Sequence, residues 1–542
     1  MPPHPALFRF LDKPTRAMGA GVLLALSMPP LGLYPLAWVA LVPLLVRWES
    51  LRHGWTLFRE AYVAFLFMAV GAGFWVLFHA SMRAALFAGL GLLLLPLPHA
   101  AAFALSSLVR ARFGLLVGLA ALVCNVLAVE YLAAHLPGGL PWLLLGHTQA
   151  GALAFNQIAD LGGVGGLSLF VLAANFLVYA AVRVAPRPGV LPGWRTLLAL
   201  LFLALLSGVA VYGDERRAAM AVPRGELSVA VVQPAEPTRV WADATDWQRV
   251  ERLATLSDRV LLGTPVDTPV HRTADRRRMP RMVVWPEAAL PPFADAAARE
   301  RLYLRLARWS ADRRATLLTG ALVQPAPGAP LHNAAVYLRQ GQPAGEYTKV
   351  HLTPFVEHLP LLGHSPVLDA MTLPEEGGRL ARGYTPVVFE GNGFRVGAVI
   401  GDEALRGDHV RRFVDDGADV VVALADAGWW GRAIGGRQLL ALARLRAVET
   451  RRAVVVATVS GTSAIVYPDG RVERLAGWME EEAVERVVPL QPDATLYTHH
   501  GDWPGRFALF GAGWFLVVLG VATAFFRRPA PAPRYGVRQA VL

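Results

Sequence analysis

Eight apolar runs, separated by arginine-rich junctions, limit what this chain can fold into more than any other feature of its sequence. A helix needs about 20 apolar residues to cross the roughly 30 Å of hydrocarbon in a bilayer. The first two runs are short for this purpose and fit tilted, broken or re-entrant helices. The runs lie at 17–31, 34–46, 61–80, 84–108, 113–133, 163–182, 196–213 and 507–526. The sequence therefore predicts a polytopic α-helical membrane protein with about eight transmembrane helices.

Charged residues are scarce and unevenly distributed. Of the 542 residues, 54% are hydrophobic and 17% are charged, whereas a soluble protein carries about 25% charged residues. The deficit lies in the first 215 residues and near the end, so we expect one soluble domain between them. The net charge of +11 comes mostly from arginine. In a membrane protein this marks cytoplasmic loops rather than nucleic-acid binding, and no nucleic-acid partner is expected.

The positions of the basic junctions orient the chain. Lys and Arg cluster before the first apolar run and after the second, fourth, sixth and eighth. The positive-inside rule makes all five clusters and both termini cytoplasmic, and puts the soluble segment in the periplasm of a Gram-negative cell. The sequence thus predicts a multi-pass inner-membrane protein. Its expected parts are a seven-helix transmembrane domain at 1–213, a periplasmic domain at 214–504, a final transmembrane helix at 505–527 and a cytoplasmic tail at 528–542.

The soluble segment alternates short β-branched strands with helical stretches. Strands are predicted at 227–232, 282–285, 315–322, 334–338, 386–390, 394–400, 420–424, 453–458 and 464–467. Helices are predicted at about 246–263, 294–313, 408–416 and 435–451. Such alternation is typical of a single α/β layered domain.

Polar stretches at 137–149 and 157–163 interrupt the apolar pattern after the fifth run. Broken helix and polar groups near membrane depth are tolerated only where they line protein or a cavity. We favour an interfacial loop that Trp142 anchors. The alternative is a vestibule for a lipid headgroup.

The stretch Phe394–Leu405 has the pattern of a catalytic turn. An apolar strand breaks abruptly at Gly401, and an acidic, helix-starting segment follows. Many enzymes hold a nucleophile at such a turn, because the strained backbone thrusts the side chain out of the sheet. Glycine fits the turn easily, since it lacks Cβ, but it has no atom that can attack a substrate.

Two further residues have the chemistry of an acyl-transfer site. Glu287 follows Pro286, which is expected to stop the strand's hydrogen-bond ladder, so that the carboxylate projects at the edge. Lys349 follows another predicted strand. Each alone has an ordinary explanation, as a solvated loop carboxylate or a surface lysine. A glutamate base, an oxyanion-stabilising lysine and a nucleophile elbow would together perform acyl transfer.

The order of these parts resembles the nitrilase (carbon–nitrogen hydrolase) superfamily, whose fold is an αββα sandwich and whose triad is Glu-Lys-Cys. The membrane pattern narrows the resemblance to the apolipoprotein N-acyltransferase family. Its members look like eight transmembrane segments with a periplasmic nitrilase domain between the seventh and eighth. Matching motifs lie at 141–146, 157–160, 285–287, 349–360, 428–431, 443–449 and 498–504.

The resemblance implies a two-step reaction. An acyl chain from a membrane phospholipid passes to the triad cysteine as a thioester, and then to the free α-amino group of a lipoprotein's N-terminal diacylglyceryl-cysteine. By position, Glu287 would be the base, Lys349 the oxyanion partner and Glu357 a supporting carboxylate. No cofactor or metal is implied. The residues expected near the substrate are Trp241, at the lipid entrance, and Asp402, Glu403 and Trp429.

The departures from the family pattern cluster at this site. The family's nucleophilic cysteine falls on Gly401 and the following aromatic residue on Asp402, while Glu403 is retained. The one cysteine of the chain, Cys124, lies in the fifth apolar run, so a shifted alignment supplies no thiol. Losing the nucleophile removes the covalent pathway itself rather than one contribution of a few kcal/mol.

Three hypotheses follow. In the first, the chain is an active N-acyltransferase that uses an unorthodox nucleophile, Asp402 or more remotely Ser460, or that transfers the acyl chain directly. In the second, it is a catalytically silent family member that binds lipoprotein or phospholipid. A periplasmic amidase fits poorly, because it needs the same cysteine. For Asp402 we expect an ion pair with Lys349 instead of attack on an ester. Three acidic groups around one lysine are also expected to raise some carboxyl pKa values.

Overall fold

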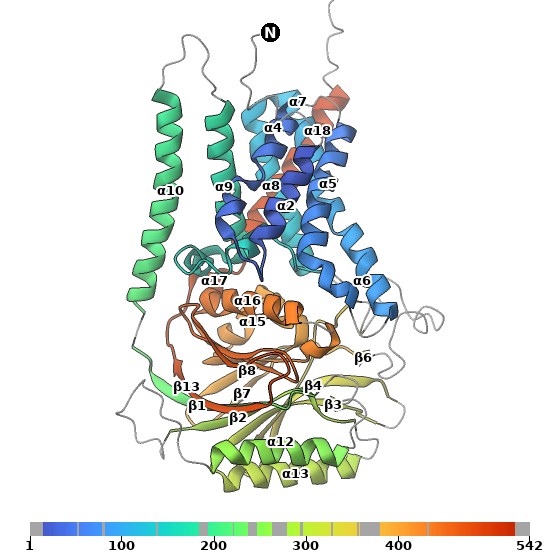
Figure 1. Ribbon diagram of the computed structural model, residues 1–542, viewed down its shortest axis with the longest axis vertical. Helices are drawn as coiled ribbons and strands as arrows, with labels where there is room; N and C mark the ends of the chain where they lie inside the picture. The colour runs from blue at the N-terminus through green and yellow to red at the C-terminus, as the bar shows by residue number, and fades with distance from the viewer. Residues whose placement is uncertain are drawn as a thin grey trace, which may run out of the picture.

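The protein is a helical bundle stacked on an α/β sandwich, and the two parts lie one above the other in Figure 1. The computed structural model describes residues 15–50, 54–78, 82–136, 139–183, 193–220, 222–236, 246–262, 279–292, 296–326, 329–354, 357, 380–430 and 433–525.

The apolar runs of the sequence form the bundle. Within the described residues, six helical segments are long and apolar enough to cross a membrane: Gly54–Phe78, Ala85–Phe113, Leu115–His135, Asn156–Arg183, Gly193–Ala218 and Trp503–Phe525. The first two runs form shorter helices. The bundle helices are α2 (Thr15–Ser27), α3 (Ala37–Ala40), α4 (Val42–Ser50), α5 (Gly54–Gly73), α6 (Met82–Leu94), α7 (Pro96–Phe113), α8 (Leu115–His135), α9 (Ala159–Arg183), α10 (Gly193–Ala218) and α18 (Trp503–Phe525).

Two mixed β-sheets form the centre of the sandwich. The first has the order β13-β1-β2-β3-β4-β5 with β6 beside β4, and the second has the order β12-β11-β10-β9-β8-β7. Central neighbours such as β1–β2 and β8–β9 are parallel, whereas outer pairs such as β1–β13 are antiparallel. The strands are β1 (Gly225–Gln233), β2 (Arg281–Leu290), β3 (Thr316–Val323), β4 (Leu331–Arg339), β5 (Gln342–Thr348), β6 (Leu380–Ala381), β7 (Val388–Glu390), β8 (Arg395–Ile400), β9 (Val420–Ala425), β10 (Ala453–Thr458), β11 (Ser463–Val466), β12 (Val472–Ala476) and β13 (Glu482–Leu490).

Helices cover the outer face of each sheet and complete the four layers of an αββα sandwich. Helices α12 (Asp246–Leu261) and α13 (Ala296–Asp312) pack on the first sheet and form the end of the molecule farthest from the bundle (Figure 1). Helices α15 (Gly407–Asp415) and α16 (Ala433–Thr450) pack on the second sheet, on the side that faces the bundle. This is the nitrilase-like sandwich that the sequence predicts.

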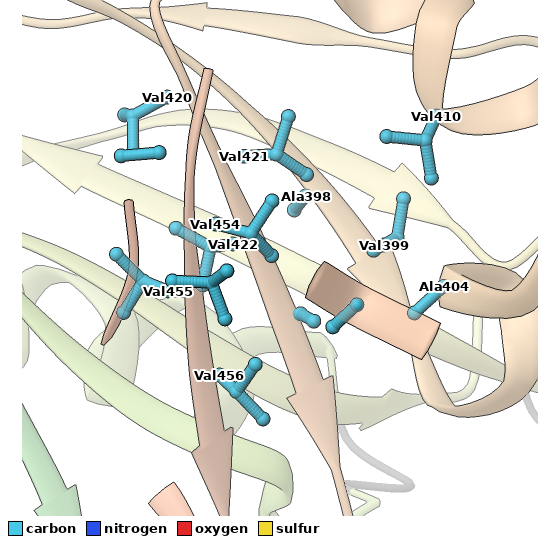
Figure 2. Close-up of a cluster of buried hydrophobic side chains, with 14 of the residues drawn as sticks. Ala398, Val399, Ala404, Val410, Val420, Val421, Val422, Val454, Val455 and Val456 are labelled. Atoms are coloured by element: carbon cyan, nitrogen blue, oxygen red, sulfur yellow. The ribbon is translucent and has the colours of Figure 1, made fainter. Parts of the chain in front are cut away.

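Valine-rich strands build the core of the second sheet. Figure 2 shows Val420–Val422 of β9 beside Val454–Val456 of β10, with Ala398 of β8 next to them. All these side chains are buried. Parallel strands covered on both faces read as continuous apolar runs, and burying each valine stabilises the fold by about 1.5–3 kcal/mol.

A buried ion pair ties the sandwich to the bundle. Arg451, just after α16, donates to Asp160 of α9 over 2.8 Å and to Gln157 over 2.6 Å. Asp160 also accepts hydrogen bonds from Tyr212 (2.7 Å) and Arg216 (2.9 Å) of α10. A buried carboxylate stays ionised only when hydrogen-bond donors compensate its charge, as they do for Asp160. The network therefore fixes the orientation of the sandwich on the bundle.

The structure corrects one expectation and adds a contact to another. Strand β2 does not end at Pro286, because its pairing with β3 is interrupted after Trp285 and resumes at Leu290. The strand bulges where the proline lacks a donor, rather than stopping. Trp142, the expected anchor of the interfacial loop, donates its indole N–H to Gln438 of α16 over 2.7 Å. It lies between the bundle and the sandwich.

Candidate active site

The bulge in β2 determines where Glu287 points. Opposite the bulge, β3 carries Gly320, where an added Cβ would lie 2.5 Å from the Pro286 carbonyl oxygen and 2.6 Å from Glu287 Cα. Only glycine allows the two strands to approach this closely. The Glu287 carboxylate reaches the second sheet, where the backbone N–H of Asp426, just after β9, donates to Oε2 over 2.9 Å.

Strand β8 ends in the predicted elbow. Gly401 has a φ of +58°, in the left-handed region that costs a residue with a side chain about 1–2 kcal/mol. The buried Glu403 carboxylate holds the turn by accepting from the backbone N–H groups of Ile400 (2.9 Å) and Val350 (2.7 Å). Arg406, at the end of the elbow, donates to the carbonyl oxygen of Ala134 over 2.8 Å. The turn is therefore fastened to both the sandwich and the bundle.

Glu287, Lys349 and Gly401 converge on one point. An ideal Cβ on Gly401 would lie 2.9 Å from Lys349 Nζ and 3.5 Å from each carboxylate oxygen of Glu287. A side chain at position 401 would thus point between the base and the cation. The elbow has the orientation of a nucleophile turn although it carries no nucleophile.

Lys349 is enclosed by carboxylates. Its side chain is 1% exposed, and Nζ lies 2.8 Å from Glu357 Oε2, 3.5 Å from Asp402 Oδ1 and 3.9 Å from Glu287 Oε1. The expected ion pair with Asp402 is present, and the pair with Glu357 is shorter. The Thr353 hydroxyl bridges the pair with Asp402, since its Oγ1 lies 3.3 Å from Nζ and donates to Asp402 over 3.0 Å. The ammonium group is therefore held in one place.

Burial and the neighbouring charges separate the protonation states of the site. Burial raises the pKa of Glu287 to about 7, although Lys349 acts in the opposite direction. Burial alone would lower the pKa of Lys349, but Glu357, Asp402 and Glu287 outweigh it and hold that pKa above its ordinary value. Burial also acts to raise the pKa of Glu357, but Lys349 overcomes this and keeps it low. At neutral pH the site thus holds a cation, an anion and a proton acceptor.

A cavity of about 90 Å³ opens at this point. Its lining combines the charged groups with an apolar side contributed by the bundle and α16. The lining residues are Trp142, Glu287, Lys349, Thr353, Glu357, Gly401, Asp402, Ala425, Asp426, Ala427, Gly435, Gly436 and Leu439. We call this cavity the reaction pocket.

The other predicted substrate residues fall in different places. Asp402 lines the reaction pocket. Glu403 faces inward with 0% exposure and accepts from the Tyr347 hydroxyl over 2.8 Å, so it positions the elbow instead of contacting substrate. The backbone of Trp429 lies in the short helix η6 (Ala427–Trp430), and its side chain lies outside the described part. Trp241 lies outside the described residues.

Sequence reasoning missed several polar groups at the site. Asn333 of β4 donates from Nδ2 to Glu287 Oε1 over 2.7 Å and to Glu357 Oε1 over 3.2 Å. The backbone N–H of Thr353 donates to Glu357 Oε2 over 2.7 Å. Thr353 lies within the motif around Lys349, which was a usable signal. Asn333 had none, because it lies near the start of a largely buried strand and no motif marks its position.

Two family models match adjacent parts of the chain. Residues 20–177 match the apolipoprotein N-acyltransferase N-terminal domain, and residues 228–492 match the carbon-nitrogen hydrolase domain. A yeast protein of known structure, Saccharomyces cerevisiae Nit3 of the nitrilase superfamily, is 16% identical with a TM-score of 0.36, covering 53% of this chain and 97% of that chain. At that level of similarity it adds nothing to the assignment.

Curated relatives match over nearly the full length. Apolipoprotein N-acyltransferase of Azotobacter vinelandii is 30% identical, covering 92% of this chain and 94% of the relative. The protein of that name from Chlorobaculum tepidum is 26% identical, covering 95% and 98%. Together with the two domain matches and the converging site, this similarity shows that the chain belongs to the apolipoprotein N-acyltransferase family.

Proposed function

We propose that this protein acts in lipoprotein N-acylation and transfers an acyl chain from a phospholipid to the α-amino group of a lipoprotein's N-terminal diacylglyceryl-cysteine. Relatives named apolipoprotein N-acyltransferase over most of the chain support the process. The observation that carries the proposal is the convergence of Glu287 and Lys349 on the point to which a side chain at Gly401 would project. A base and a cation that meet at a closed turn suit acyl transfer.

Without a thiol at position 401, the proposed route is direct transfer in one ternary complex. The amine nitrogen attacks the ester carbonyl carbon, a C–N bond forms and the ester C–O bond breaks. Glu287, with a pKa near 7, takes the amine proton and passes it to the departing lysophospholipid oxygen. The Lys349 ammonium stabilises the oxyanion that develops on the carbonyl oxygen. The absence of a side chain at Gly401 leaves room for the amine between these groups.

Binding without turnover is the second candidate, and one observation favours it: Gly401 carries no attacking atom. The first candidate is better supported. The charged groups retain the protonation states that acyl transfer needs, and their hydrogen-bond partners are in place. A pocket used only for binding has no need of a glutamate whose pKa is near neutrality.

The proposed topology follows the charge pattern. We propose that segments 1–213 and 505–527 are embedded in the bacterial inner membrane, and that the sandwich domain at 214–504 is periplasmic. The termini, including the tail at 528–542, would be cytoplasmic. Alternating basic junctions support this orientation. Cysteine-accessibility labelling of single-cysteine variants in intact cells tests it.

The reaction is tested with the purified full-length protein, a phospholipid with a labelled acyl chain and a synthetic diacylglyceryl-cysteine peptide. We expect acylated peptide, and no hydroxylamine-sensitive acyl adduct on the protein by peptide mass spectrometry. Initial rates with both substrates varied should give intersecting double-reciprocal lines, because both bind before transfer. Parallel lines with an acyl adduct would refute direct transfer.

Complementation gives the matching test in cells. In a strain depleted of its own apolipoprotein N-acyltransferase, the native gene should restore growth and a Glu287→Gln variant should not. If the purified protein binds the peptide but neither acylates it nor complements, the binding function replaces the proposed one.

A further inference from the structure

One buried glutamine of α16 joins three segments of the bundle. The side chain of Gln438 is 2% exposed and lies far in sequence from all its partners. Its Oε1 accepts from the indole N–H groups of Trp75 (3.0 Å) and Trp142 (2.7 Å). Its Nε2 donates to the carbonyl oxygens of Pro29 (2.5 Å) and Ala72 (2.8 Å). Two lone pairs and two N–H groups are thus all used.

The packing around this glutamine is close. The rings of Trp75 and Trp142 lie 5.2 Å apart, and Trp75 is fully buried. Gly435, in the first turn of α16, has no space for a side chain, because an added Cβ would lie 2.6 Å from the Trp75 ring. The first turn of α16 therefore rests directly on the bundle. We call Trp75, Trp142 and Gln438 the tryptophan clamp.

The clamp stands between two cavities. Trp142 lines the reaction pocket together with Gly435 and Leu439. Its neighbours in the same loop, Leu140 and Leu143, line an apolar cavity of about 540 Å³ inside the bundle. The loop thus separates the polar pocket of the sandwich from an apolar space on the bundle side. A substrate anchored in a bilayer has to approach from the bundle side.

We infer that Gln438 is a positioning residue for acyl transfer: it fixes Trp142 as the bundle-side wall of the reaction pocket and so sets the affinity for the phospholipid donor. The identity of the donor rests on the proposed function. The indole N–H is the one polar group of the Trp142 side chain, and it donates to Gln438 of the sandwich. Without that bond the indole loses its fixed orientation, and the wall that the lipid meets is no longer preorganised.

The test substitution is Gln438→Met, which keeps the length of the side chain and removes all four hydrogen bonds. Full-length protein in nanodiscs is titrated with a dialkyl ether phospholipid, which binds but cannot be transferred. KM and kcat are then measured with the diacyl phospholipid. We expect Kd and KM to rise about tenfold with kcat within about threefold, the scale of one buried hydrogen bond. Gln342→Met is the matched control, because Gln342 of β5 is exposed.

A second, milder variant separates positioning from general stability. Trp142→Phe keeps an aromatic ring but removes the indole N–H together with the pyrrole part of the ring, and we expect it to raise Kd as well. If Gln438 acts through Trp142, the double variant should be no worse than Trp142→Phe alone. Unchanged Kd and KM in folded Gln438→Met, or additive effects in the double variant, would overturn the inference. If the native protein binds the ether lipid but transfers nothing, the proposed function fails while the Kd comparison still decides the role of Gln438.

Discussion

Restoring a thiol at position 401 tests the geometry of the site most directly. Gly401→Cys adds a Cβ 2.9 Å from Lys349 Nζ and 3.5 Å from the Glu287 carboxylate oxygens. Lys349 must therefore withdraw by a few tenths of an ångström, toward carboxylates that already surround it. The left-handed φ of +58° adds a cost of about 1–2 kcal/mol to the folded state. We expect a modestly less stable protein with its fold intact.

The chemical gain should outweigh this cost. The new thiol would lie beside a base with a pKa near 7 and beside a fixed ammonium group, and such surroundings favour the thiolate. A positioned general base alone contributes about 10²–10⁴ in rate. We therefore expect Gly401→Cys to form a thioester with an acyl chain from phospholipid, which neither the native protein nor a Gly401→Ala control can form.

The assay uses phospholipid with a labelled acyl chain, release of the label by hydroxylamine and peptide mass spectrometry of position 401. Gly401→Ala is the matched control, because it carries the same Cβ and backbone strain without sulfur. The two variants should have thermal midpoints within a few degrees of each other. A folded Gly401→Cys protein without any adduct would refute the convergence of Glu287, Lys349 and Gly401 on a reactive arrangement.

Three further predictions concern the base, the bulge and the elbow. Glu287→Gln should lower the transfer rate by at least about 100-fold. In the native protein the rate should rise with pH through about 7, because only ionised Glu287 accepts a proton. A flat rate profile from about pH 5.5 to 8.5 would argue against this base. Gly320→Ala should displace the bulge, lower the free energy of unfolding by about 1–3 kcal/mol and lower the transfer rate about 100-fold. The control is Gly225→Ala, whose Cβ would meet its nearest neighbour at 3.6 Å, and it should change neither stability nor rate. Burial raises the pKa of Glu403 to about 7. The folded state therefore binds more protons than the unfolded state between about pH 4.5 and 7. For this reason the contribution of Glu403 to stability falls as pH rises through that window. Thermal unfolding should therefore show the native protein losing stability relative to Glu403→Gln from pH 4.5 to 7, and a constant difference would contradict this pKa.

Local patterns were sufficient to predict most of the elements. The apolar runs, the valine strands β9 and β10 and the amphipathic helices α12 and α13 all have periodicities that a single segment displays. Besides the two-residue strand β6, the longer strands β5, β12 and β13 were missed. They are polar, partly exposed edge or near-edge strands, and only their partners make them strands. Strand β13, for example, pairs antiparallel with β1 over its full length.

Some residues of the candidate site could likewise be predicted from local sequence, and others could not. The elbow at Gly401 and the charged residues Glu287 and Lys349 could be predicted, because each stands at a recognisable end of a strand. Their hydrogen-bond partners could not. Asn333 and the backbone N–H of Asp426 come from strands in different sheets, and contacts between distant segments leave no trace in local sequence.

The sequence alone determined that this protein is membrane-embedded, that it carries one α/β domain, and that no cysteine occupies the elbow at position 401. These are properties of composition and short-range pattern, which no arrangement of the chain can alter. Only the tertiary structure decided that position 401 points between Glu287 and Lys349, and that Gln438 binds Trp75 and Trp142, of which Trp142 lines the pocket. Those facts depend on how layers far apart in the sequence pack, and packing is set by the whole fold.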